Sequence, residues 1–179
     1  MERQQQAEER LRSVVSYLEM RTPPADPPPA PPQPDLTLMH LEHPSVPFYR
    51  FLYNTVGEPW LWLDRRRMDD AALAALIQHP QVSVNVLYGG GEPLGYAELD
   101  RRVPGEVEVV YFGIMPHCLG RGLGRYLMSQ ALALAWAGAP RRVWLHTCTL
   151  DHPGALAFYQ RAGFVKTHEE VEWVEPPPI

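Results

Sequence analysis

The glycine-rich segment Pro116–Leu127, PHCLGRGLGRYL, carries the clearest chemical signal in the chain. Gly120, Gly122 and Gly124 alternate with other residues between an expected strand and an expected helix, and two of those residues are arginines. Glycines let main-chain N–H groups converge without obstruction from a Cβ atom, and a helix N-terminus adds a partial positive charge. The two arginines add phosphate donors. The segment therefore predicts a site for a phosphate or a diphosphate.

Two common phosphate-binding motifs do not fit this segment. A P-loop needs G-x-x-x-x-G-K-[ST], but the sixth position counted from Gly120 is Arg125, and no Lys-Ser/Thr pair follows. A dinucleotide fingerprint needs G-x-G-x-x-G, and its third glycine is replaced by Arg125 in one frame and by Leu127 in the other. Two interpretations of the segment remain. It binds a different phosphate ligand, or it is a tight strand-to-helix turn with arginines on its surface.

A second group of chemically active side chains is His146, Cys148 and His152, in the pattern H-x-C-x-x-x-H. This spacing is not a standard zinc pattern, and no fourth ligand is evident in the sequence. We predict no metal site here and expect the group to pack at the end of a strand beside the phosphate ligand.

The elements that must position these residues alternate between strands and helices along the chain. Period-2 or continuous apolar runs predict strands, and 3.6-residue periodicity with capping residues predicts helices. The expected strands are 36–41, 82–88, 94–99, 106–115, 142–148 and 165–174, and the expected helices are 47–53, 69–78, 120–136 and 153–162. Gly89-Gly90-Gly91 should form the turn of a hairpin.

Two motifs in this arrangement resemble the GNAT superfamily of N-acyltransferases, which use acyl-CoA. Leu119–Gly124 takes the place of the family's Q/R-x-x-G-x-G/A loop between strand and helix, with Leu119 where the family has Gln or Arg. His152–Phe164 fits the family's N-x-x-A-x-x-F/L-Y-x-x-x-G-F motif, with His152 in place of Asn. The resemblance covers Asp35–Val174. It implies an α/β (α+β) fold, with a mixed, mostly antiparallel central sheet, a splayed strand pair and flanking helices.

The resemblance implies acetyl-CoA as co-substrate, with its diphosphate on the glycine loop and its pantetheine arm along the preceding strand. The expected cofactor-binding residues are Ile114, Met115, Leu119, Gly120, Arg121, Gly122, Gly124, Arg125, His152 and Tyr159. In the family the N–H at the position of Ile114 faces the thioester oxygen, beside a bulge that splays the strand. Gly113 is the residue that we expect to form this bulge.

Acetyl transfer to an amine needs a base for the ammonium proton and an acid for the leaving thiolate. Glu108, six residues before Ile114, matches the spacing of the general base in the histone-acetylating branch of the family. Glu106 on the same strand and Glu98 on the neighbouring strand are the alternatives. Tyr159 matches the family tyrosine that lies near the sulfur and protonates the thiolate.

The acceptor wall of the family comes largely from its first helices and the loop between them. In this chain that region is rich in aromatic side chains and contains two acids, Glu58 and Asp64. The aromatic residues are Phe48, Tyr49, Phe51, Tyr53, Trp60 and Trp62. They could bind an amine cation or simply pack the helices onto the sheet. The run Arg65-Arg66-Arg67 is expected on a solvated surface.

The segment before the acyltransferase domain separates into a helix and a linker. Leu11, Val14, Val15 and Leu18 follow an i, i+3, i+4, i+7 spacing, which predicts an amphipathic helix over residues 1–21 that docks on the domain or on a second subunit. Prolines crowd residues 22–34, where we expect a polyproline II spacer or, alternatively, a ligand for aromatic grooves. The domain then runs over residues 35–175, and a Pro-rich tail over 176–179.

Composition excludes several other classes of protein. The chain has 179 residues, a net charge of -5 and two cysteines, so we expect neither a nucleic-acid partner nor a disulfide framework. No apolar run approaches the length of a membrane span, and the polar N-terminal residues resemble no targeting signal, so we expect a cytoplasmic protein.

The sequence thus predicts a GNAT acyltransferase that moves an acetyl group from acetyl-CoA to a small-molecule or peptide amine in a ternary complex. A non-catalytic acyl-CoA-binding module and an adaptor that works through the proline-rich segment are the alternatives. A homodimer is left open.

Overall fold

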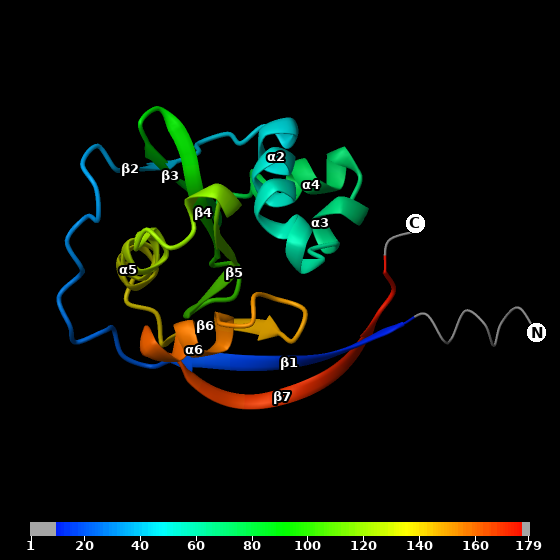
Figure 1. Cartoon of the computed structure of the whole chain (residues 1–179). Coiled ribbons are helices and arrows are strands. Elements are labelled where there is room, and N and C mark those ends of the chain that lie inside the picture. The colour runs from blue at the N-terminus through cyan, green and yellow to red at the C-terminus, as the bar shows by residue number, and fades with distance from the viewer. Residues whose placement is uncertain (1–9, 177–179) are drawn as a thin grey trace, which may run out of the picture.

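A seven-stranded sheet organises residues 10–176, the part of the chain that this computed structural model describes (Figure 1). The strand order is β2-β3-β4-β5-β6-β1-β7, and every neighbouring pair is antiparallel except β5 and β6. The strands are β1 (Leu11–Met20), β2 (Thr37–His40), β3 (Val82–Gly89), β4 (Glu92–Asp100), β5 (Glu106–Ile114), β6 (Arg142–Cys148) and β7 (Val165–Val174). The predicted mixed and mostly antiparallel sheet is confirmed.

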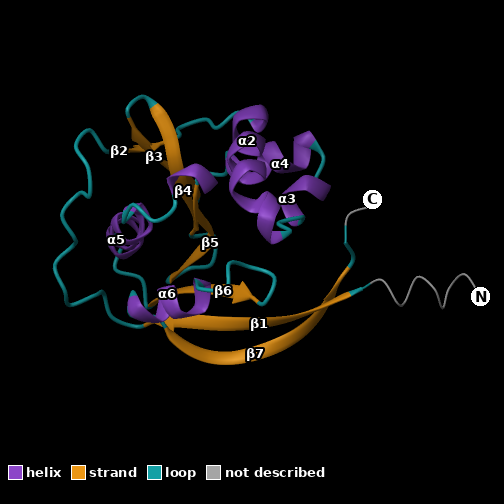
Figure 2. Cartoon of the chain, viewed as in Figure 1, coloured by secondary structure: helices purple, strands orange, loops and turns teal. Residues whose placement is uncertain are grey.

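Helices cover the sheet from both sides, with α2, α3 and α4 on one side of β4 and β5 and α5 on the other (Figures 1 and 2). The helices are α2 (Val46–Gly57), α3 (Asp64–Arg67), α4 (Asp70–Ile77), α5 (Leu123–Trp136) and α6 (Ala155–Arg161), with short 3-10 turns η1 (Glu58–Trp60) and η2 (Pro116–Cys118). Ser45 and Asp69 accept hydrogen bonds from the first turns of α2 and α4, as N-caps do. All four helices expected within residues 36–174 are present.

The prediction of an N-terminal amphipathic helix was wrong, because residues 11–20 form a strand. β1 lies between β6 and β7 and pairs with both, and Val15, Leu18 and Met20 are buried. A strand that is covered on both faces does not alternate strictly between polar and apolar residues, so its apolar positions can also fit a helical stripe. Residues 1–9 of the predicted helix lie outside the described residues.

The proline-rich segment 22–34 contains neither helix nor strand and connects β1 to β2 around the outside of α5 (Figure 2). Proline lacks the N–H that a helix or a central strand would need, which accounts for this course. Because β1 is part of the sheet of its own chain, its apolar residues Val15, Leu18 and Met20 are buried without a second subunit.

The parallel pair β5 and β6 diverges along its length. The two strands pair only from Glu106 with Arg142 to Glu108 with Trp144, although β5 continues to Ile114. The register between β4 and β5 shifts after Glu98. Glu98 pairs with Tyr111, but the next residue, Leu99, pairs with Val109.

Val110 is therefore the extra residue of a bulge, and the prediction that Gly113 forms the bulge was wrong. Gly113 pairs regularly with Tyr96, and its lack of a side chain serves the packing of α2 instead. A Cβ atom at Gly113 would overlap the Val56 side chain, so this glycine lets the helix approach the sheet closely.

Candidate functional site

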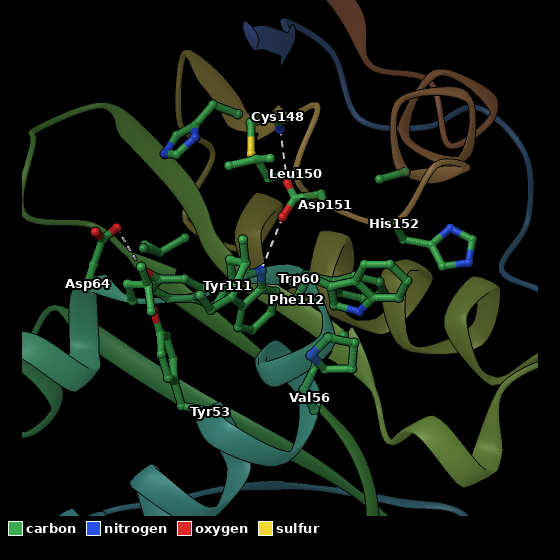
Figure 3. Close-up of a pocket in the computed structure, with 18 of the residues that line it drawn as sticks. Tyr53, Val56, Trp60, Asp64, Tyr111, Phe112, Cys148, Leu150, Asp151 and His152 are labelled. Carbon is green, nitrogen blue, oxygen red and sulfur yellow. Dashed lines mark hydrogen bonds between the residues drawn. The ribbon is translucent and has the colours of Figure 1, made fainter. Parts of the chain in front are cut away.

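The divergence of β5 from β6 opens a cleft with a volume of about 370 Å³. Its walls come from β5, from β6 and the loop that follows it, from α6 and from the η1 segment, as Figure 3 shows. The N-terminus of α5 lies at one end, where Leu119 and Gly124 line the cleft. Ser13 of β1 and Glu172 of β7 line the other end.

The end near α5 has the features of an anion site. Gly120 and Gly122 adopt positive φ angles of 77° and 76°, a conformation that costs residues with a Cβ atom about 1–2 kcal/mol. Gly122 is the N-cap of α5 and offers no side chain to the helix. Within residues 10–176, no main-chain N–H from Gly120 to Arg125 donates a hydrogen bond. These amides, at the positive end of the helix, are available to a diphosphate.

The side chains around this loop are open to solvent. Arg121 and Arg125 are exposed, and the Arg121 guanidinium donates to the carbonyl oxygen of His117 at 3.2 Å. Leu119 is also exposed, so the position that the family gives to Gln or Arg contributes no polar side chain here. Pro32 of the connecting segment lies against Gly122, 3.4 Å from where a Cβ atom would stand.

The main-chain amides at the end of β5 divide between the sheet and the cleft. The N–H of Met115 donates to the carbonyl oxygen of Leu94 at 2.8 Å, which uses it within the sheet. Because successive amides of a strand point in opposite directions, the N–H of Ile114 points away from β4 and toward the gap beside β6. Of the two residues predicted to bind cofactor on this strand, Ile114 therefore offers a donor, whereas the N–H of Met115 is already used.

Tyr159 of α6 lines the cleft and is half-buried. Its ring makes edge contacts with Phe112, Phe158 and Phe164, with centroid distances of 6.3, 5.5 and 6.2 Å. Burial raises the pKa of this phenol above its ordinary value of 10.0, and Asp151 adds to the increase. The hydroxyl therefore keeps its proton at neutral pH, as a proton donor to a thiolate must.

Glu108 lies just behind the cleft and not on its wall. Its carboxylate oxygen is 3.8 Å from Nε2 of His146, and it is His146 that lines the cleft. Burial, reinforced by the negative charge of Asp100, raises the pKa of Glu108 from its ordinary 4.5 to about 7. A carboxyl group with this pKa can exchange a proton near neutral pH, and His146, at 3.8 Å too far for a direct hydrogen bond, is its neighbour on the cleft wall.

The two alternative bases are engaged in ion pairs. Glu98 is fully buried, accepts a hydrogen bond from the Tyr49 hydroxyl and pairs with Arg65 at 2.7 Å. Glu106 pairs with Arg142 at 3.0 Å. Arg65 was expected on a solvated surface, but its side chain is only 13% exposed because it neutralises Glu98 beneath α3. Neither carboxylate belongs to the wall of the cleft.

Asp151 is a residue of this site that sequence reasoning missed. Figure 3 shows its carboxylate between the end of β6 and the η1 segment. It accepts from Thr147 Oγ1 at 2.6 Å, from the Cys148 N–H at 2.9 Å and from Trp62 Nε1 at 3.1 Å. Asp151 thereby fixes the two sides of the cleft relative to each other. Nothing in the sequence marks Asp151 for this role, because an acid directly after a strand resembles any turn residue.

His152 holds its own loop. Its Nδ1 accepts from the N–H of Gly154 at 2.9 Å, and its ring packs against Trp60 with a centroid distance of 5.0 Å (Figure 3). Within residues 10–176 no group of three or more His, Cys, Asp or Glu side chains could hold a metal ion. The described helices also include none long and apolar enough to cross a membrane.

The aromatic residues near the first helices divide between core and cleft. Tyr49 and Tyr53 are both buried, and Tyr53, Trp60 and Trp62 line the cleft. Tyr111 of β5 joins them and donates to the Asp64 carboxylate at 3.3 Å (Figure 3). Some of the aromatic residues predicted for an acceptor wall thus line the cleft, whereas Tyr49 packs the helix onto the sheet, and the acceptor wall itself stays a prediction.

The chain is similar to known proteins in sequence and in fold. The model of the acetyltransferase (GNAT) family matches residues 48–164. The chain is 33% identical over 102 residues to a mycothiol acetyltransferase of Nocardioides sp., which covers 57% of this chain and 30% of that protein. It is 41% identical over 78 residues to the N-alpha-acetyltransferase RimI of Mycobacterium tuberculosis, which covers 42% of this chain and 47% of that protein. The chain thus spans less than half of each of these relatives.

A solved structure shows the same fold over almost the whole chain. The GCN5-related N-acetyltransferase from Sphaerobacter thermophilus superposes with a TM-score of 0.64 at 18% sequence identity. The superposition covers 99% of this chain and 56% of that protein.

Proposed function

Because the chain belongs to the acetyltransferase (GNAT) family, we propose that it transfers an acetyl group from acetyl-CoA directly to an amine in a ternary complex. One observation supports this function most strongly. The free amides of Gly120–Arg125 stand at one end of the cleft, and the cleft continues from them past the Ile114 amide and Tyr159. The proposed anion site and the proposed site of acyl transfer thus share one continuous space.

The co-substrate fits the residues present in three ways. The glycine loop and the α5 N-terminus would hold its diphosphate, with Arg121 and Arg125 close enough in sequence to add donors. The gap between β5 and β6 would take the extended pantetheine arm as an added strand. The Ile114 N–H would face the thioester oxygen and stabilise the negative charge that develops there.

The proton balance then assigns roles to three side chains. An acceptor ammonium loses one proton to Glu108 through His146, since His146 is the member of the pair that reaches the cleft. The neutral nitrogen attacks the carbonyl carbon, the C–N bond forms, and the C–S bond breaks. Tyr159 gives its proton to the leaving thiolate, and the second proton lost by the nitrogen restores the phenol through solvent.

Thiol release from acetyl-CoA with a panel of amines tests this function. We expect the wild-type protein to release coenzyme A in the presence of at least one amine, and Tyr159→Phe to lower kcat while the dissociation constant of coenzyme A stays unchanged. Binding of coenzyme A without turnover on any amine would favour a non-catalytic acyl-CoA-binding module. Calorimetry that detects no binding at all would reject both functions.

A further inference from the structure

The end of the cleft opposite to α5 opens onto the face of β6, β1 and β7 that carries Tyr17. The Tyr17 ring stacks on His168, with a centroid distance of 4.4 Å and an interplanar angle of 5°. On the side of β6 the ring is flanked by His146 at 5.6 Å and by Trp144, which is stacked on it at 6.4 Å. Tyr17 and His146 are cross-strand neighbours, so this aromatic surface continues directly into the cleft that His146 lines.

Three carboxylates surround this aromatic surface. Glu170 accepts a hydrogen bond from the Tyr17 hydroxyl at 3.3 Å, and the charges of Glu170, Glu172 and Glu108 all act on that phenol. Glu172 lines the cleft itself, directly across the β1–β7 pair from Ser13.

These three acids have no strongly basic partner. Within residues 10–176, no Lys or Arg forms a salt bridge with them, and His146 and His168 lie 3.8 Å from Glu108 and Glu170. Arg67 also lines the cleft, where its guanidinium donates to the main-chain oxygen of Glu175 at 2.7 Å. The surface therefore keeps an excess of negative charge, which favours a cation.

A separate observation indicates a ligand at this end. The Ser13 side chain is buried, only 1% exposed, and lines the cleft. Its hydroxyl oxygen has no hydrogen-bond partner among the described residues that meets normal geometry, and the neighbouring Cys148 thiol is a weak donor and acceptor. A buried hydroxyl without a partner costs free energy, which a ligand that reaches Ser13 would recover.

We propose that the acceptor is a linear diamine or polyamine whose second ammonium group binds to Glu170 and Glu172, beside Tyr17. This inference rests on the proposed acetyl transfer and names the substrate class of the same site. The reacting amine would extend into the cleft toward His146, while the distant ammonium would be bound by two carboxylates. An acceptor with a single amine would leave the carboxylates unpaired and bind more weakly.

The test compares 1,4-diaminobutane with 1-aminobutane, which differ in the second ammonium alone. We expect the wild-type KM for the diamine to be at least about tenfold lower, equivalent to about 1.4 kcal/mol. In the double variant Glu170→Gln/Glu172→Gln the two KM values should become nearly equal. The matched control is Glu169→Gln, which alters the same strand on its other face, where Glu169 pairs with Lys166 at 2.8 Å. That control should keep the wild-type ratio.

Nearly equal KM values in the wild-type protein, or a ratio that the double variant leaves intact, would overturn the inference while acetyl transfer stands. If neither amine is acetylated, the proposed function fails for these acceptors. Equilibrium dialysis of spermidine then measures binding to the proposed cation site without any turnover. Binding that is lost in the double variant and kept in Glu169→Gln would support the cation site. Equal binding by all three proteins would reject it.

Discussion

Replacement of Glu108 by Gln should change both stability and activity in a pH-dependent way. The carboxyl is buried behind the cleft, with 21% of its side chain exposed, and burial raises its pKa from 4.5 to about 7. The folded chain therefore holds this proton more tightly than the unfolded chain does. Asp100, paired with Glu108 across the sheet, contributes to the same increase.

The sign of the effect on stability follows from this increase. At pH values below 4.5 Glu108 is protonated in both the folded and the unfolded state, so it does not change the free energy of unfolding. Between pH 4.5 and about 7 Glu108 ionises in the unfolded state first, and the free energy of unfolding falls. The full difference corresponds to about 3 kcal/mol, an upper bound because solvent reaches part of the carboxylate. Glu108→Gln, which carries no charge, should thus be more stable than wild type by about 1–3 kcal/mol at pH 8 and nearly equal to it at pH 4.

Urea unfolding at both pH values measures this difference, and kcat/KM as a function of pH measures the role in catalysis. Wild-type activity should rise with pH through about 7 as the carboxylate forms, and Glu108→Gln should lose about a hundredfold or more of kcat/KM together with this rise. Glu106→Gln is the matched control on the same strand, and it should keep the wild-type profile. A Glu108→Gln protein that retains the rise, or that gains no stability at pH 8, would refute the assignment.

Three other substitutions test separate parts of the structure. Gly122→Ala places a Cβ atom at a φ of 76°, so calorimetry should show coenzyme A binding weakened by about tenfold, and Gly138→Ala, at an open position, should bind like wild type. Arg65→Leu leaves a buried carboxylate unpaired and should lower the free energy of unfolding by about 3–5 kcal/mol in urea; recovery in a second variant that also carries Glu98→Leu would confirm the cause. Val15→Pro removes a main-chain donor from a strand that is paired on both sides, so its thermal unfolding temperature should fall far below that of wild type, and an unchanged temperature would contradict the sheet order.

Much of the fold was predictable because local signals and tertiary packing agree in the domain. The glycine turn between β3 and β4, the N-cap of α4 and the glycine loop before α5 each act through the backbone conformation of a few residues. The β1 segment was not predictable in this way. Its apolar residues serve two faces of the sheet, and its partners lie far along the chain, so no local pattern distinguishes this strand from a helix.

The candidate site was predictable where a motif determines the position of a residue. Gly124 and Tyr159 line the cleft, and Gly120 and Gly122 belong to the loop at its end, while their roles stay predictions. Charge partners could not be predicted, because they depend on contacts between distant elements. Arg65 stands in a run of three arginines, and nothing in that run indicates that it alone neutralises the buried Glu98.

The position of β1 also bears on how this chain folds as it is synthesised. β1 emerges from the ribosome well before β6, and β7 follows later still, yet β7 pairs with the sheet through β1. Until both partners are made, both edges of β1 expose free main-chain donors and acceptors, which can pair with other extended chains. Closure of the sheet must then join residues far apart in sequence, which is slow. We therefore expect nascent chains that stop before β7 to aggregate readily, and the final assembly of β6, β1 and β7 to be the slowest folding step.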